Sequence, residues 1–326
     1  MQSIGSKVIV RRLLFFLTFI SLLGLPASIR VVEIQKIQTK DFFVIEKGQG
    51  INAIIDNLKN QNNNKFLSLL KVKFLFESKN IIPGRYEIKP GMTYIELFED
   101  IFEGNLQQFR FTIIEGTVAK DALSKLEEII KNNNLNFQIS SKTKEIFSNE
   151  SLILPDTYFF TDRKQLERLM INQQIRLNNI LKRLWKEKPK ENPLKNINEA
   201  LVLASIVERE AAVEWEREQI ASVFLSRIRD GWRLDADPTL IYGYYGDFSK
   251  KITKDNLRAV KGDNNPFNTY KIKGLPPRPI CYPSLSSIEA VIMSSPGEYF
   301  FFVAKGDGTH IFSKTLDEHN IAVNNR

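Results

Sequence analysis

Residues 203–214 read LASIVEREAAVE, an apolar run followed by three glutamates within seven residues. One face of an amphipathic helix has apolar residues at i, i+3, i+4 and i+7, and these positions hold Leu203, Ile206, Val207 and Glu210. Glu208 points roughly 140° away from Leu203, with Leu201 and Ser205. A carboxyl group on an apolar face costs desolvation free energy unless it is protonated or partnered. Glu210 therefore needs an explanation that the other two glutamates do not.

The sequence leaves open two explanations for the position of Glu210 on the apolar face. It is either a proton donor in a reaction, with a pKa raised by burial, or a buried glutamate tied to an arginine such as Arg217 or Arg227. Glu214, four residues further on, would share its face and raise its pKa by like-charge repulsion. Glu208 is expected to be a solvated partner of a basic residue, and both Glu208 and Glu214 are candidates for contact with a substrate.

Composition excludes several classes of function. With 326 residues, of which 43% are hydrophobic and 11% aromatic, the chain can bury a sizeable core in one or two domains. The net charge of +8 is spread over scattered lysines rather than a basic stripe with aromatics, so nucleic acid is a disfavoured partner. Cys281 is the only cysteine, and His310 and His319 lie nine residues apart. No disulfide, metal or cofactor is expected.

The N-terminus favours export. Lys7, Arg11 and Arg12 precede the uncharged residues 13–29, which would span roughly 26 Å as a helix. A cleaved signal peptide is the alternative, but this run is longer than the usual apolar core of about 7–15 residues. We expect a cytoplasmic tip and transmembrane anchor over residues 1–30 and a stalk over 31–40. The remainder would lie outside the cytoplasm, anchored in the plasma (inner) membrane by a single span.

The fold class predicted for the exported part is α+β. Residues 41–108 repeat a strand–turn–helix pattern and form a small module, and residues 109–326 form a larger mixed α+β domain. Residues 231–283 hold six of the thirteen prolines, which indicates ordered irregular backbone of the kind that is usually functional. Two strands, over 299–306 and 309–314, form a hairpin near the C-terminus.

Polar residues in and after this irregular segment are candidates for a binding site. Asp237 and Thr239 either form a turn or donate and accept hydrogen bonds at a cleft. Asn268 and Tyr270 supply an amide and an aromatic face that a ligand can bind. The C-terminal residues His310, Glu318, His319 and Asn320 either complete the cleft or fasten the C-terminal segment to it.

Six motifs occur in an order that resembles the endolytic murein transglycosylase (MltG, or YceG-like) family. They are LASIVERE (203–210), LDADPTLIYG (234–243), NPFNTY (265–270), GLPPRPI (274–280), YFFFVAKGDGTHIFS (299–313) and DEHN (317–320). The resemblance covers about residues 40–322. It implies one N-terminal transmembrane helix, a LysM-like module at 41–108 and a catalytic transglycosylase domain at 109–326. The family's catalytic glutamate, the second Glu of VExE, falls on Glu210.

The chemistry that the resemblance implies is lytic cleavage between N-acetylmuramic acid and N-acetylglucosamine in nascent peptidoglycan strands, which ends their elongation. Glu210 would protonate the bond and then take the proton of the muramoyl C6 hydroxyl, closing a 1,6-anhydro ring. The expected partners are glycan strands, whose acetamido sugars would be bound by Asp237, Thr239, Asn268 and Tyr270. Peptidoglycan synthases (penicillin-binding proteins) are the candidate protein partners. Arg278 departs from the glycine that the family often has there. A membrane-tethered glycan-binding scaffold without catalysis is the alternative function.

Overall fold

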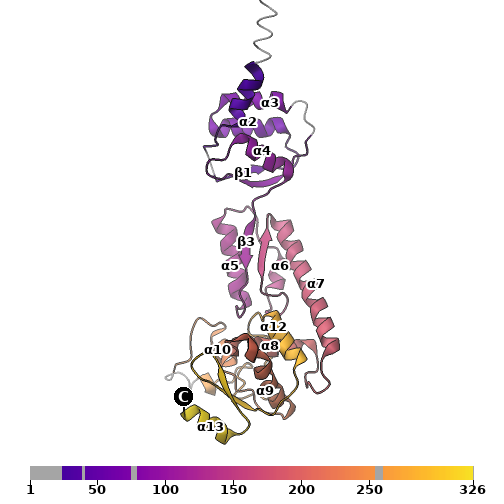
Figure 1. Ribbon diagram of the computed structural model, residues 1–326, viewed down its shortest axis with the longest axis vertical. Helices are drawn as coiled ribbons and strands as arrows, with labels where there is room; N and C mark the ends of the chain where they lie inside the picture. The colour runs from indigo at the N-terminus through magenta and orange to yellow at the C-terminus, as the bar shows by residue number, and fades with distance from the viewer. Residues whose placement is uncertain (1–23, 39–40, 75–78, 254–259, 326) are drawn as a thin grey trace, which may run out of the picture. The chain divides into compact units, whose positions relative to one another are not determined.

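The computed structural model describes residues 24–38, 41–74, 79–253 and 260–325. The described residues divide between Gln108 and Phe109 into two compact units, each with its own core. Helices predominate, and the strands described form three two-stranded antiparallel sheets (Figure 1). The predicted α+β class is therefore confirmed.

The predicted anchor falls largely outside the described residues. Of residues 13–29, only 24–29 are described, and they belong to a helical stretch over 24–33. Among the described residues, no helix is both long enough and apolar enough to cross a membrane. The anchor and the localisation that depends on it remain predictions.

The N-terminal unit is built on strands β1 and β2, which pair antiparallel so that Phe42 lies opposite Glu87. A capping box fixes the start of its last helix, because Thr93 and Glu96 each bond the other's backbone N–H. Its elements are β1 (Phe42–Ile45), α2 (Ile51–Asn62), η1 (Lys65–Leu69), α3 (Leu70–Lys73), β2 (Gly84–Glu87) and α4 (Tyr94–Glu103). The LysM-like character predicted for this unit remains a prediction.

The second unit begins with the antiparallel pair β3 (Phe109–Thr112) and β4 (Thr157–Phe160). Helices α5 (Ala119–Asn132) and α6 (Ser141–Ile146) share a core with this pair. The long helix α7 (Arg163–Glu187) contributes to two cores. Leu166 and Met170 pack beside the strands, whereas Leu177, Leu181 and Leu184 pack against the helices that follow.

Helix α8 (Ile197–Glu210) lies at the centre of the second core. It contacts α9 (Arg217–Arg229), α10 (Asp237–Tyr245) and α12 (Leu285–Met293), as Figure 1 shows. Every residue from Ala200 to Val207 is buried, so the helix is not amphipathic as its spacing predicted. Its second face packs on the proline-rich segment, where Ser205 Oγ accepts a hydrogen bond from the Ile280 backbone N–H at 3.0 Å.

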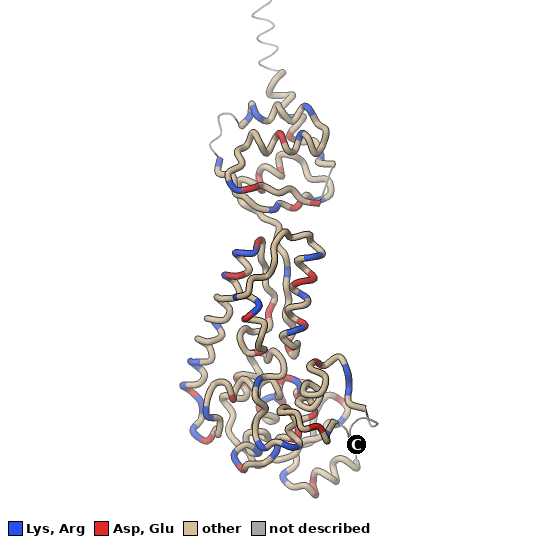
Figure 2. The backbone as a smooth tube through the Cα atoms, turned by 180° about the vertical axis from the view of Figure 1, so that it is seen from behind, with Lys and Arg blue, Asp and Glu red and all other residues tan. Residues whose placement is uncertain are grey.

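A hairpin and a final helix complete the unit. Strands β5 (Phe301–Ala304) and β6 (His310–Ser313) pair antiparallel, and α13 (Leu316–Asn324) packs on both of them. A short helical turn, Glu214–Glu216 (η2), separates α8 from α9. Figure 2 shows lysines and arginines interspersed with acidic residues through both units, which fits the scattered charge of the sequence.

Candidate active site

A cleft of about 430 Å³ opens in the second unit beside the last residue of α8. It is formed where α8, α9, the start of α10, the β5–β6 hairpin and α13 meet. The residues that line it are Glu210, Arg227, Leu234, Asp235, Asp237, Tyr270, Phe301, Phe302, Val303, Ala304, His310, Leu316 and His319. Of the ten residues predicted from the sequence to form a site, five lie here: Glu210, Asp237, Tyr270, His310 and His319.

Glu210 has the electrostatic environment of a proton donor. It ends α8, and the chain turns into extended backbone at Ala211. Burial raises the pKa of Glu210 to about 8, and the negative charge of Asp237 adds to this effect, while Arg227 and Arg209 oppose it. A carboxyl group with this pKa carries its proton at neutral pH, which is what a general acid requires.

The like charge near Glu210 comes from Asp237 and not from Glu214. Because α8 ends at Glu210, Glu214 lies in the separate turn η2 and is exposed to solvent outside the cleft. The predicted repulsion between Glu214 and Glu210 is wrong, and so is a contact of Glu214 with a substrate in this cleft.

Glu208 is a buried structural carboxylate. Its Oε2 accepts hydrogen bonds from the Ser284 backbone N–H at 2.9 Å and from Ser287 Oγ at 2.7 Å. Its Oε1 lies 3.5 Å from Arg217, and 7% of its side chain is exposed. The predicted basic partner is present, but the prediction of solvent exposure is wrong. Glu208 does not line the cleft, so the predicted substrate contact does not fit the structure. Arg217, one candidate partner of Glu210, is thereby occupied at Glu208.

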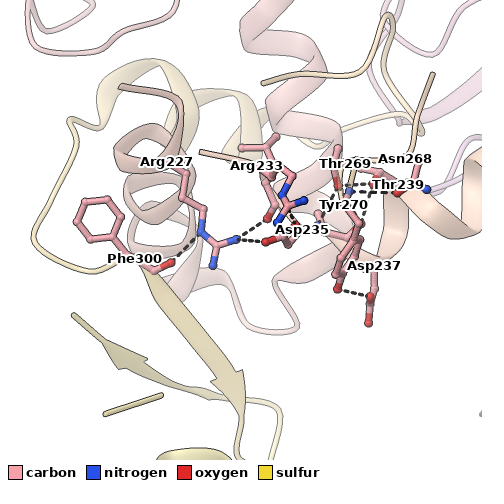
Figure 3. Close-up of polar contacts among 11 residues, drawn as sticks. Arg227, Arg233, Asp235, Asp237, Thr239, Asn268, Thr269, Tyr270 and Phe300 are labelled. Atoms are coloured by element: carbon pink, nitrogen blue, oxygen red, sulfur yellow. Dashed lines mark hydrogen bonds and ion pairs between the residues drawn. The ribbon is translucent and has the colours of Figure 1, made fainter. Parts of the chain in front are cut away.

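Arg227 joins three segments of the chain at the cleft wall through polar contacts (Figure 3). From α9, its Nε donates to the Phe300 carbonyl at 2.7 Å and its Nη1 donates to the Leu234 carbonyl at 2.6 Å. Nη1 also lies 3.9 Å from Asp235, a residue held at φ +48°. The sequence indicated Arg227 only as a partner for Glu210. Its backbone contacts depend on carbonyl positions that side-chain patterns do not show.

Asp237 and Tyr270 form a polar pair on the cleft surface. The Tyr270 hydroxyl donates to Asp237 Oδ1 at 2.8 Å (Figure 3). Burial and the neighbouring Asp237 raise the pKa of Tyr270, so the phenol keeps its proton. Asp237 is the first residue of α10, where a negative charge is stabilised by the helix dipole. Sugar binding by this pair remains a prediction.

Thr239 and Asn268 shape the loop instead of facing the cleft. Both side chains are fully buried. Thr239 Oγ1 donates to the Ala236 carbonyl at 2.7 Å, and Asn268 Nδ2 donates to the Lys261 carbonyl at 3.1 Å. The sugar contacts predicted for these two residues do not fit the structure. Their hydrogen bonds with the backbone agree with the turn-forming alternative for Thr239.

The C-terminal candidates separate into two groups. His310 and His319 line the cleft, and the ring of His319 stacks on Phe301 at 5.3 Å between centroids. Glu318 instead caps α13 by accepting hydrogen bonds from the backbone of Lys314 and Thr315, and Asn320 is exposed and does not line the cleft. The prediction of a cleft role for Asn320 therefore does not fit the structure.

Arg278 lies away from the cleft lining and has a local partner. Its Nη1 is 3.7 Å from the buried carboxylate of Glu150, and its guanidinium lies 5.6 Å from the centre of the Tyr242 ring. Tyr242 donates to the other oxygen of Glu150 at 3.1 Å. The arginine thus neutralises a buried charge between the two cores of the second unit.

Comparisons with known proteins agree with the motifs. A model of the YceG-like family matches residues 43–325. The endolytic murein transglycosylase of Bacillus subtilis (strain 168) is 27% identical over 302 residues, which are 85% of this chain and 82% of that protein. The protein of the same name from Streptococcus pneumoniae serotype 2 is 27% identical over 52% of this chain and 31% of its own length. A crystal structure of a YceG-like protein from Listeria monocytogenes has a TM-score of 0.52 and 25% identity, covering 87% of this chain and 100% of that one.

Replacing Glu210 by Gln removes a carboxyl group that the fold keeps protonated. Because its pKa rises from an ordinary 4.5 to about 8, the folded protein binds this proton more tightly than the unfolded chain does. Wild-type stability therefore falls as the pH rises from 4.5 through 8. We expect Glu210→Gln to have a higher Tm than wild type at pH 8, with the difference shrinking toward pH 4.5. Thermal unfolding across this range measures it, and a difference that grows toward acid contradicts it.

Replacing Glu208 by Ala leaves Arg217 and the Ser284 N–H without their buried acceptor. We expect a loss of roughly 3–5 kcal/mol in the free energy of unfolding, because removing one partner strands a buried charge. Glu214→Ala removes an exposed carboxylate of the same region and should change it by less than about 0.5 kcal/mol. Denaturant unfolding of the two variants tests the contrast. Equal small effects would show that Glu208 is not structural.

Proposed function

This chain belongs to the YceG-like family, and from that premise we propose that it is a peptidoglycan lytic transglycosylase. The observation that carries the proposal is the buried carboxyl group of Glu210, with its pKa raised to about 8, in a cleft lined with aromatic and polar side chains. The curated relatives are named endolytic murein transglycosylases. We infer that the enzyme cuts within nascent glycan strands, between N-acetylmuramic acid and N-acetylglucosamine, and so ends their elongation.

Glu210 performs both proton transfers in this proposal. As an acid it gives its proton to the glycosidic oxygen while the bond from that oxygen to muramoyl C1 breaks. As a base it then takes the proton of the muramoyl C6 hydroxyl, whose oxygen bonds to C1 and closes the 1,6-anhydro ring. The nucleophile belongs to the substrate, so it is held at a high effective concentration and no water molecule is consumed.

The cleft also holds Asp235 and Asp237, which favours one alternative chemistry. Most glycoside hydrolases use two carboxyl groups, the second acting as a nucleophile or as a base on water. In this cleft, however, Asp237 accepts a hydrogen bond from Tyr270 and Asp235 lies 3.9 Å from Arg227. Both carboxylates thus have partners of their own, and ring closure by the substrate requires neither.

Glu210→Gln should fold and lose activity. Gln has nearly the same shape but no titratable proton, and general acid–base catalysis is typically worth about 10²–10⁴-fold. We expect this loss in the release of 1,6-anhydromuramoyl products from un-crosslinked glycan strands. Wild-type activity should also fall as the pH rises through about 8, where the acid form is lost.

Glu214→Gln is the control for the loss of a carboxylate and should keep wild-type activity. Full activity of Glu210→Gln would place the acid elsewhere. Products with reducing ends from the wild-type protein would identify a hydrolase. Strand binding without any cleavage by the wild type would favour the alternative of a membrane-tethered scaffold.

The proposal includes a location at the plasma membrane. Residues 13–29 carry no charge and follow Lys7, Arg11 and Arg12, which is the pattern of a cytoplasmic N-terminus before a membrane span. Residues from about 31 onward would face the cell wall, where glycan strands and their synthases are the partners. Protease added to intact spheroplasts should digest this part of the chain. Full protection, with digestion only after lysis, would show the opposite topology.

A further inference from the structure

A second buried carboxylate, Glu216, holds one of the residues that line the cleft. Glu216 ends the turn η2 and directly precedes α9, and His310 begins strand β6. Glu216 Oε1 accepts a hydrogen bond from the His310 backbone N–H at 2.9 Å, and Oε2 lies 2.7 Å from His310 Nδ1. The two side chains are only 9% and 8% exposed. The Glu216 carboxylate therefore contacts both the backbone and the ring of His310.

This two-point contact bears on which ring nitrogen carries the proton. With Glu216 as an ionised carboxylate, which can only accept hydrogen bonds, the proton between the pair lies on His310 Nδ1. In the neutral imidazole the other nitrogen, Nε2, then carries a lone pair and accepts. Glu216 also stands at the N-cap of α9, where the helix dipole stabilises a negative charge.

The other ring nitrogen is available to the cleft. His310 lines the cleft and Glu216 does not, and because Nδ1 faces Glu216, Nε2 is the ring nitrogen left for a ligand there. Phe302 meets the imidazole at 90° with 5.3 Å between ring centroids, and Phe312 packs against it at 6.3 Å. These contacts restrict rotation about the side chain, so the direction of Nε2 is set before any ligand binds.

We propose that His310 presents Nε2 as a neutral hydrogen-bond acceptor to a sugar hydroxyl group in the cleft, and that Glu216 is the positioning residue that fixes this polarity. The inference rests on the proposed function and names a contact that the substrate class makes. A hydroxyl taken out of water must find an acceptor. The carboxylates of Asp235 and Asp237 already face Arg227 and the Tyr270 hydroxyl. His310 Nε2 supplies a further acceptor in the cleft.

The variant Glu216→Gln reverses the polarity while keeping the shape. Its amide oxygen can still accept from the His310 backbone N–H, but its NH₂ group must then donate to Nδ1. The ring proton moves to Nε2, which becomes a donor toward the cleft. We expect about a ten- to hundredfold loss in kcat/KM on un-crosslinked glycan strands, the scale of one lost hydrogen bond to a buried group. Glu214→Gln, two residues earlier and exposed, removes the same charge and should leave kcat/KM unchanged.

Two changes at His310 separate its ring edges and leave Glu216 intact. Asn places an amide donor near the position of Nδ1 but has no atom at Nε2, whereas Gln reaches the position of Nε2. We expect His310→Gln to keep more activity than His310→Asn, although both should fold. The reverse order would mean that the bond to Glu216 alone matters, and the proposal would fail.

Nitrogen NMR of the imidazoles reads the tautomer directly, and the chain has only two histidines, so a His319→Gln spectrum completes the assignment. Wild type should show His310 protonated at Nδ1, and Glu216→Gln should show it protonated at Nε2. A wild-type proton at Nε2 overturns the proposal, as does unchanged kcat/KM in a Glu216→Gln protein with the flipped tautomer.

If the wild type cleaves nothing, the proposed function fails separately. Binding of peptide-free glycan strands to wild type and Glu216→Gln then decides the contact, with weaker binding by the variant expected and equal binding excluding it.

Discussion

The second unit depends on burying helix α8 from all sides while leaving its last residue at a cleft. A helix satisfies its own backbone hydrogen bonds except at its ends, so its middle can be enclosed without loss. Residues Ala200–Val207 are buried in this way, because α9, α12 and the proline-rich segment surround them. At the C-terminal end the apolar packing stops, and Glu210 meets the cleft. The same burial that builds the core therefore gives this carboxyl group its raised pKa.

Glu208 and Glu210 lie two residues apart but have different roles, because different groups surround their carboxyl groups. Glu208 meets hydroxyl, amide and guanidinium donors from α12 and α9, so its burial is compensated and it joins these helices. Glu210 instead lies near the negative charge of Asp237, another residue of the cleft lining, which favours its protonated form. One helix thus supplies both a structural carboxylate and a candidate acid.

The sequence predicted those features that depend on local periodicity and on ordered motifs. These were the α+β class, the inward direction of Glu210 and the pairing of the two C-terminal strands. The sequence did not predict side-chain roles that depend on contacts between residues far apart in the chain. The acceptor role of Glu208 toward Ser284 spans 76 residues and the pair of Glu216 with His310 spans 94, so neither leaves a periodic signal. The sugar contact predicted for Asn268 failed for a related reason. An amide in an irregular segment can form hydrogen bonds with the nearby backbone as readily as with a sugar.

Arg227 couples the strength of the acid to the architecture of the cleft. Its positive charge lowers the pKa of Glu210, opposing burial, so its removal alone would make the carboxyl group a weaker acid. Yet the same guanidinium holds the Phe300 carbonyl at the start of the hairpin and the Leu234 carbonyl before α10. The hairpin carries Phe301 and His310 into the cleft wall, and α10 begins with Asp237. Arg227 therefore affects both the proton affinity of Glu210 and the positions of the groups around it, so a substitution of Arg227 would change both.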